Sequence, residues 1–211
     1  MVLYIGVDPG IAGFIAIQNE DNPDITLIPN PVILSQTTGR NRLDGHGLDG
    51  ILQGFATQPH FLVVEKQQPM RKPIFGRVEN TNERIMLDEG AKQGVPASFN
   101  TGYGYGMIIM GLVVHKINHL AVGAQKWQRH MFDKIRLSTP KLNSLAKAKE
   151  LYPHLDIKNN HNKSDALLLM TYAKLVHRAG KGKMLYTTSK FASRSPIDSL
   201  LESQALEGSG T

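Results

Sequence analysis

The chain has 211 residues, of which 41% are hydrophobic and 20% charged, so it can form one folded domain and differs from disordered or fibrous sequences. It contains no cysteine, which excludes disulfides, thiolate metal sites and a cysteine nucleophile. The formal net charge of +6 favours a polyanionic partner such as nucleic acid, and the apolar runs are too short to cross a bilayer.

The N-terminal part of the chain is expected to form strands. Apolar and β-branched residues predict strands over 2–7, 13–17 and 24–28, and the turns between them favour antiparallel pairing. Apolar spacing predicts a helix over 42–55, although its glycines weaken the pattern. The continuous apolar run over 61–64, which ends at Glu65, is typical of a strand buried on both faces of a sheet.

The remaining chain is expected to be mainly helical. Helices are predicted over 79–93, 102–117, 125–131, 140–151 and 164–177, and a short strand over 119–122. Three antiparallel strands followed by strands that alternate with helices predict a mixed five-stranded α/β sheet flanked by helices. Because the composition becomes rich in serine and threonine from residue 187, we expect one domain over 1–186 and a flexible tail over 187–211.

Basic residues concentrate between 116 and 149, where one acid, Asp133, stands against eight cations. This pattern is typical of a surface that follows a phosphate backbone, and equally of a solvated helical face. The eight are Lys116, Lys126, Arg129, Lys134, Arg136, Lys141, Lys147 and Lys149.

Three acids occupy positions that would bring them together. Asp8 and Glu65 each follow an apolar strand directly, at the end where ligands bind in open α/β sheets, and Asp165 lies near the start of a long apolar helix. Clustered carboxylates favour Mg²⁺ or Mn²⁺, and two such ions roughly 3.5–4 Å apart would hold a phosphodiester. The expected reaction is therefore phosphodiester hydrolysis.

Each acid also has a structural interpretation. Asp8 precedes Pro9-Gly10 and is typical of a turn, Glu65 could pair with Lys66 or Arg71, and Asp165 could stabilise the positive end of its helix. The combination of the three, in this order, is more specific than any one of them.

Six motifs occur in one order over residues 2–179. They are Ile5-Gly6-Val7-Asp8-Pro9-Gly10; residues 63–69, which include Glu65; residues 100–106 with Gly102, Gly104 and Gly106; Gln125-Lys126-Trp127; Lys141 with residues 144–153; and residues 163–169, which include Asp165. The first motif alone also opens actin-like ATPases and sugar kinases. Together, the six resemble the RuvC family of Holliday junction resolvases, particularly its phage and organelle members.

The resemblance implies an RNase H-like fold, a homodimer, and paired nicks in four-way DNA junctions, with two Mg²⁺ ions at each site or Mn²⁺ in their place. Asp8, Glu65 and Asp165 would be the acidic metal ligands. A fourth ligand is expected one turn before the last acid, where His161 matches best and Asn162 is the rival. A neutral imidazole binds Mg²⁺ poorly, but it could position or deprotonate the attacking water.

The resemblance also implies a DNA-binding surface. Lys126 and Lys141 match positions that carry cations near the scissile phosphate, where positive charge stabilises the transition state. Phe75 is a candidate wedge that stacks on an unpaired base. The other expected DNA-binding residues are Arg71, Lys72, Arg129, Lys134 and Lys147. The three glycines at 102, 104 and 106 either open a helix that approaches phosphate or form a tightly packed helix start.

Two other functions stay open at this point. The chain could be another RNase H-like nuclease, which acts on RNA, flaps or forks, or a junction-binding protein that has lost cleavage. No signal peptide is evident, so we expect a location in the cytoplasm of a bacterium or a phage-infected cell, with an organelle or virus as alternatives.

Overall fold

A five-stranded mixed sheet forms the centre of the protein in the computed structural model, which describes residues 1–37, 39–67, 71–77, 84–92, 95–132 and 139–180, without the side chains of 71–97. Its order is β3-β2-β1-β6-β9, where β1 is antiparallel to β2 and parallel to β6. The strands are β1 (Leu3–Val7), β2 (Phe14–Asn19), β3 (Ile25–Pro29), β6 (His60–Lys66) and β9 (His119–Gly123). The predicted mixed five-stranded α/β sheet flanked by helices is confirmed.

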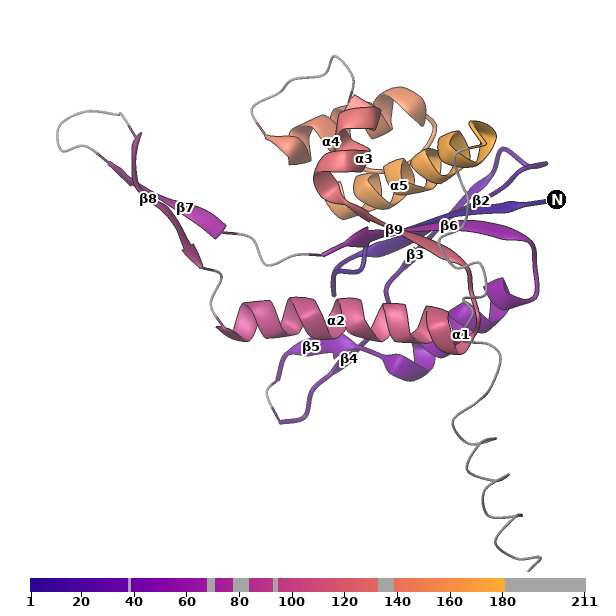
Figure 1. Ribbon diagram of the computed structural model, residues 1–211, viewed down its shortest axis with the longest axis horizontal. Helices are drawn as coiled ribbons and strands as arrows, with labels where there is room; N and C mark the ends of the chain where they lie inside the picture. Colours follow the sequence, from indigo (N-terminus) through magenta and orange to yellow (C-terminus); the bar gives the residue numbers. More distant parts are fainter. Residues whose placement is uncertain (38, 68–70, 78–83, 93–94, 133–138, 181–211) are drawn as a thin grey trace, which may run out of the picture.

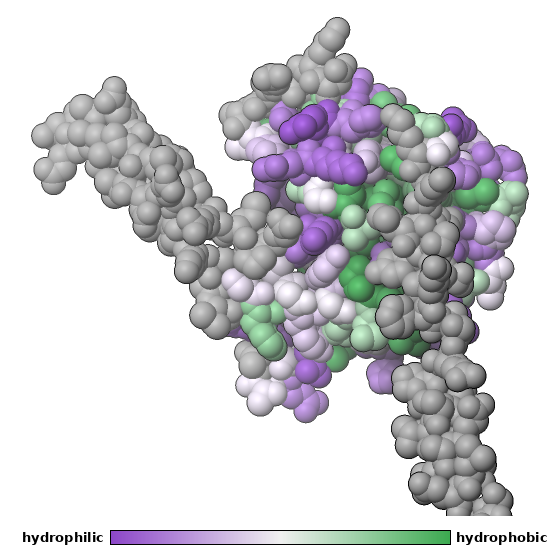
Figure 2. All heavy atoms as spheres, in the orientation of Figure 1, coloured by the Kyte–Doolittle hydropathy of each residue, from purple (hydrophilic) through white to green (hydrophobic). Residues whose placement is uncertain are grey.

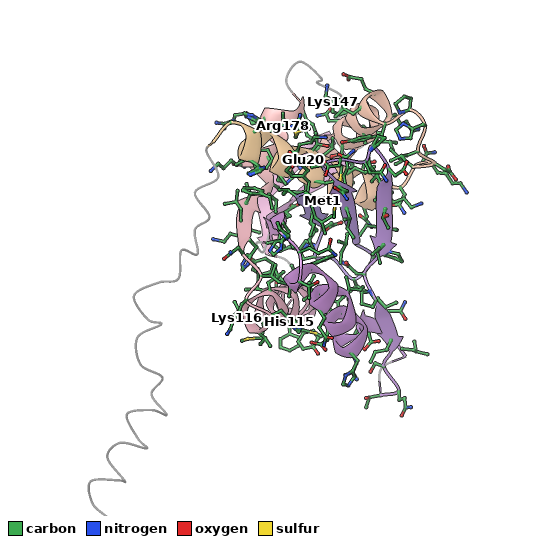
Figure 3. The ribbon with its side chains drawn as sticks, turned by 90° about the vertical axis from the view of Figure 1, so that its right-hand side faces the viewer. Met1, Glu20, His115, Lys116, Lys147 and Arg178 are labelled. Atoms are coloured by element: carbon green, nitrogen blue, oxygen red, sulfur yellow. The ribbon has the colours of Figure 1, made fainter. Side chains whose placement is uncertain are left out.

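Helices cover both faces of this sheet (Figure 1). One layer contains α1 (Gly45–Ala56) and α2 (Val95–Val114), and the other contains α3 (Ala124–Phe132), α4 (Pro140–Leu151) and α5 (His161–Arg178). The alternation of side chains along β1 places Tyr4 in the core under α5, and Ile5 and Val7 in the core under α1 and α2. Figure 3 shows the two layers from the side, with Lys147 on one and His115 on the other.

Gly6 sets how closely α5 approaches the sheet. A Cβ atom at Gly6 would overlap the main chain of α5 at Ala166 and Met170 and would lie 2.8 Å from the carbonyl carbon of Leu169. The helix therefore packs its backbone directly on β1, which only glycine permits at this position. This contact brings the first turns of α5 beside the carboxyl end of β1.

Two small hairpins extend the fold. Strands β4 (Val32–Leu34) and β5 (Asn41–Leu43) pair with each other, as do β7 (Arg71–Arg77) and β8 (Arg84–Lys92). The second hairpin follows β6 closely and extends away from the helices and the sheet (Figure 1).

One predicted helix contains a strand, and two other helices begin at different residues from those expected. Residues Arg84–Lys92 form strand β8 rather than part of a helix over 79–93, because pairing with β7 overrides the local helix propensity of this segment. Helix α1 begins at Gly45, since the Asp44 carboxylate caps it by accepting a hydrogen bond from the His46 amide at 3.1 Å. Helix α2 begins at Val95, so the glycines at 102, 104 and 106 lie inside it rather than at its start.

The remaining expected elements fall close to their predicted positions. Helix α4 has the predicted bounds, and α5 begins at His161, three residues before the expected start, because the Asn160 side chain caps it. Within the described ranges, no helix has the length and apolar character needed to span a membrane. The predicted tail over 187–211 lies outside the described residues.

Candidate active site

The three predicted acids meet at one end of the sheet. Strands β1 and β6 are parallel neighbours in which Val7 pairs with Val64, so the residues that follow, Asp8 and Glu65, stand side by side at the carboxyl end. Asp165 lies in the second turn of α5, next to Ala166, the residue whose backbone packs on Gly6 of β1. Two adjacent strands and one helix therefore deliver three carboxylates to the same place.

The carboxylates act on one another electrostatically. Burial raises the pKa of Asp8 to about 7, and the negative charge of Asp165 adds to this shift. Burial raises the pKa of Glu65 to about 8, with further contributions from the charges of Asp8 and Asp165. Burial also raises the pKa of Asp165. The cluster is thus a set of buried acids whose ionised forms need a compensating positive charge.

Two basic residues stand near Asp165. The proximity of His161 and of Lys141 opposes the effect of burial and lowers the pKa of Asp165. Residue His161 begins α5 and therefore lies one turn before Asp165, on the same helix. Lys141 comes from the first turn of α4.

Trp127 and Ser144 approach the cluster, and neither was assigned a role from the sequence. Both side chains are buried, and attraction to the Trp127 indole lowers the pKa of Glu65, while attraction to the Ser144 hydroxyl lowers that of Asp165. Neither donor reaches hydrogen-bond geometry, since Trp127 Nε1, Ser144 Oγ and Asp165 Oδ1 are all buried and have no hydrogen-bond partner in the part of the chain that the structure describes. The two donors are therefore near the carboxylates but not bonded to them. Their places in two of the six motifs were the only sequence signal.

The donor chemistry of the cluster fits a hard cation. Within the described ranges, no three histidine, aspartate or glutamate side chains stand close enough to hold one ion together. However, three carboxylates supply the oxygen ligands that Mg²⁺ and Mn²⁺ prefer, and the buried Asp165 Oδ1 has no hydrogen-bond partner among the described residues. An unpartnered buried oxygen beside two further carboxylates is what a cation would satisfy.

The two candidates for the fourth position are placed differently. The side-chain nitrogen of Asn162 donates a hydrogen bond to the carbonyl oxygen of Ala12 at 2.8 Å, in the loop between β1 and β2. The helix cap is Asn160, which accepts from the amides of Asn162 and Lys163, so His161 does not cap the helix. His161 is thus the candidate that influences Asp165 electrostatically.

The expected DNA-binding residues are only partly described. Lys126 and Arg129 are exposed on α3, and Lys147 forms an ion pair with Glu150 at 2.7 Å on α4. Hydrophilic side chains gather over the layer that contains α3 and α4 (Figure 2). Lys134 lies outside the described residues, and Arg71, Lys72 and Phe75 belong to β7, whose side chains are likewise outside the description.

Comparison with known proteins yields similar solved structures. No protein-family model matches the sequence, and no curated protein matches it. A structure of RuvC from Thermus thermophilus in complex with a Holliday junction substrate has 12% identity and a TM-score of 0.48, covering 85% of this chain and 97% of that chain. A second Thermus thermophilus RuvC structure has the same identity and TM-score, covering 84% of this chain and 96% of that chain.

Proposed function

We propose that this protein is a metal-dependent endonuclease that resolves four-way DNA junctions. The observation that carries the proposal is the meeting of Asp8, Glu65 and Asp165 at the carboxyl end of β1 and β6, with raised pKa values for all three. Buried acids of this kind destabilise a fold unless a cation compensates them, so their presence favours a catalytic over a structural role.

The three acids are the proposed metal ligands, with His161 as the proposed fourth. Bound there, Mg²⁺ or Mn²⁺, in two positions, would activate a water molecule and neutralise charge on the scissile phosphate. The charges of Asp8 and Asp165 raise the pKa of Glu65, so the three carboxylates are close enough to influence one another.

The proposed reaction is hydrolysis of a phosphodiester. The oxygen of water bonds to phosphorus while the ester bond to the leaving oxygen breaks, which leaves a phosphate end and a hydroxyl end. A neutral His161 would accept the proton of the water or orient it. Lys141, which already acts on Asp165, and Lys126 on α3 would stabilise the charge that develops on the phosphate.

The position of the β7–β8 hairpin supports a branched substrate. It follows β6 closely after Glu65 and extends outward from the end of the sheet that carries the acids (Figure 1). We propose that Arg71, Lys72 and Phe75 on this hairpin contact the branch point. Arg129, Lys134 and Lys147 would bind the phosphates of the arms.

The outer face of α2 supports a homodimer. The sequence of α2, Val95–Val114, contains no charged residue, yet Phe99, Tyr103, Met110, Val113 and Val114 are exposed. Phe99 and Tyr103 stack on each other with ring centres 6.2 Å apart. DNA phosphates would find no cation on this face, whereas a second copy of a protein with a net charge of +6 can approach most closely where the surface is uncharged and apolar.

A junction-cleavage assay tests the proposal. The protein should bind a synthetic four-way junction more tightly than linear duplex and nick it only after Mg²⁺ or Mn²⁺ is added. Asp8→Asn should abolish nicking and preserve binding, because binding depends on the basic surface. Equal cleavage of linear duplex, or cleavage of forks, flaps or RNA instead, would indicate another RNase H-like nuclease. Tight binding without cleavage would indicate a junction-binding protein.

A further inference from the structure

The loop that carries Asp8 is closed by its own main chain. The Asp8 amide donates to the Phe14 carbonyl at 3.0 Å, and the Gly13 amide donates to the Gly10 carbonyl at 2.8 Å. These bonds leave the carbonyl oxygens of Asp8 and Gly10 pointing toward one common position.

Asn30 fills that position. It follows β3, its side chain is 3% exposed, and its Nδ2 donates to the carbonyl oxygens of Asp8 at 2.8 Å and of Gly10 at 2.7 Å. Its own amide donates to the Gly13 carbonyl at 2.9 Å. A Cβ atom at Gly13 would lie 2.7 Å from Asn30 Nδ2, so the side chain packs against a residue that must be glycine. One residue thus forms three hydrogen bonds to the Asp8 loop.

The orientation of the Asn30 amide is fixed by these partners. If the amide were reversed, its oxygen would face two carbonyl oxygens and repel both. In the observed orientation Oδ1 is buried and accepts no hydrogen bond from the described residues. An unpaired buried acceptor destabilises a fold. The side chain therefore keeps its two donated hydrogen bonds even though its Oδ1 accepts none.

We propose that Asn30 is a positioning residue that holds the Asp8 carboxylate in place for metal binding and cleavage. This inference rests on the proposed function. Without the Asn30 amide, the carbonyl oxygens of Asp8 and Gly10 would both be buried without this donor, and their negative partial charges would repel each other. The peptide that follows Asp8 would then rotate to separate them. Because the φ angle of Pro9 is fixed by its ring, Pro9 cannot absorb that rotation, so the Cα atom of Asp8 would shift and carry its carboxylate with it.

Gln18 offers a matched control. Its side chain is 8% exposed, and its Nε2 donates to the Pro23 carbonyl at 3.1 Å, so it also ties a buried amide to a turn. However, Gln18 pairs with Tyr4, at the opposite end of β1 from Asp8. Gln18 Oε1 also accepts a hydrogen bond from Lys174 Nζ at 3.2 Å, about two and a half turns of α5 beyond Asp165. Truncating Gln18 therefore removes two side-chain bonds, both at a distance from the acids.

The experiment compares wild type, Asn30→Ala, Asn30→Ser and Gln18→Ala by two measurements. The first is the rise in melting temperature as Mn²⁺ alone is titrated, which gives an apparent metal affinity without any DNA. The second is the split of junction nicking into kcat and KM, at a temperature where every variant is folded. Asn30→Ser keeps one donor, and it remains measurable if the alanine variant does not fold.

Asn30→Ala should lose about 10- to 100-fold in Mn²⁺ affinity and in kcat, while its KM for the junction stays near the wild-type value. Asn30→Ser should lose less, and Gln18→Ala should lower only the melting temperature. Asn30 variants that are less stable but keep wild-type Mn²⁺ affinity and kcat would overturn the proposal, and would mean that Asn30 only stabilises the fold. If the wild type binds Mn²⁺ without cutting junctions, the proposed function fails, while the Mn²⁺ affinities still decide the role of Asn30.

Discussion

Replacing Asp8 with asparagine should make the metal-free protein more stable at pH 8. Burial and the charge of Asp165 raise the pKa of Asp8 from 3.8 to about 7. At pH 8 the folded protein therefore holds an ionised carboxylate that is buried and close to another negative charge. Asparagine has nearly the same shape and carries no charge. The variant should therefore lose the repulsion and keep the packing.

The size and pH range of this effect follow from the two pKa values. The folded protein holds the Asp8 proton more tightly than the unfolded chain, so this group's contribution to stability is present below about pH 4 and is lost as the pH rises to about 7. A shift of about three units corresponds to about 4 kcal/mol at pH 8. The gain of Asp8→Asn should accordingly be near zero at pH 4 and largest at pH 8.

Urea unfolding in EDTA, at several pH values between 4 and 8, measures this difference directly. Asp24→Asn is a suitable control, because Asp24 is an exposed acid in the turn before β3. Added Mg²⁺ should stabilise the wild type at pH 8 and Asp8→Asn much less, since the variant lacks a proposed ligand. Equal stability of wild type and Asp8→Asn at pH 8 in EDTA would refute the conclusion that the acids form a buried, mutually repelling cluster.

Three further predictions test other parts of the molecule. Gly6→Ala should destabilise the protein by about 3 kcal/mol or more, measured by urea unfolding, because the added methyl group would overlap the backbone of α5; a change below about 1 kcal/mol would contradict this packing. His161→Ala should reduce nicking and alter its pH profile more than Asn162→Ala, whose amide is bonded to the loop, and two fully active variants would mean that neither is the fourth ligand. Met110→Glu on the exposed face of α2 should convert a dimer into monomers by size-exclusion chromatography with light scattering, and a monomeric wild type would remove the proposed interface.

The local parts of the site could be predicted from the sequence, because short patterns encode them. Asp8 and Glu65 each end an apolar run, and such runs formed adjacent strands whose carboxyl ends coincide. The position of Asp165 is less local: it depends on α5 lying against β1 at Gly6, and the sequence shows a glycine in a strand without showing what packs on it.

The parts that sequence reasoning missed depend on contacts between distant segments. The side-chain amide of Asn30 binds a loop twenty residues earlier in the chain, and no sequence pattern in either segment predicts this contact. Trp127 and Ser144 could be noticed only as members of motifs, because their approach to Glu65 and Asp165 arises from the packing of α3 and α4. Strand β8 was mistaken for a helix, since its composition suits both states and its pairing with β7 decided between them.

The contact between Gly6 and α5 also bears on how this protein can vary over time. Because main-chain atoms on both sides make that contact, the separation of Asp8 from Asp165 does not depend on the sizes of the surrounding side chains. Core residues such as Leu167 or Leu168 can be exchanged for others of similar volume while the two acids keep their spacing. The backbone contact at Gly6 thus ties the spacing of these two acids to the main chain rather than to particular core side chains.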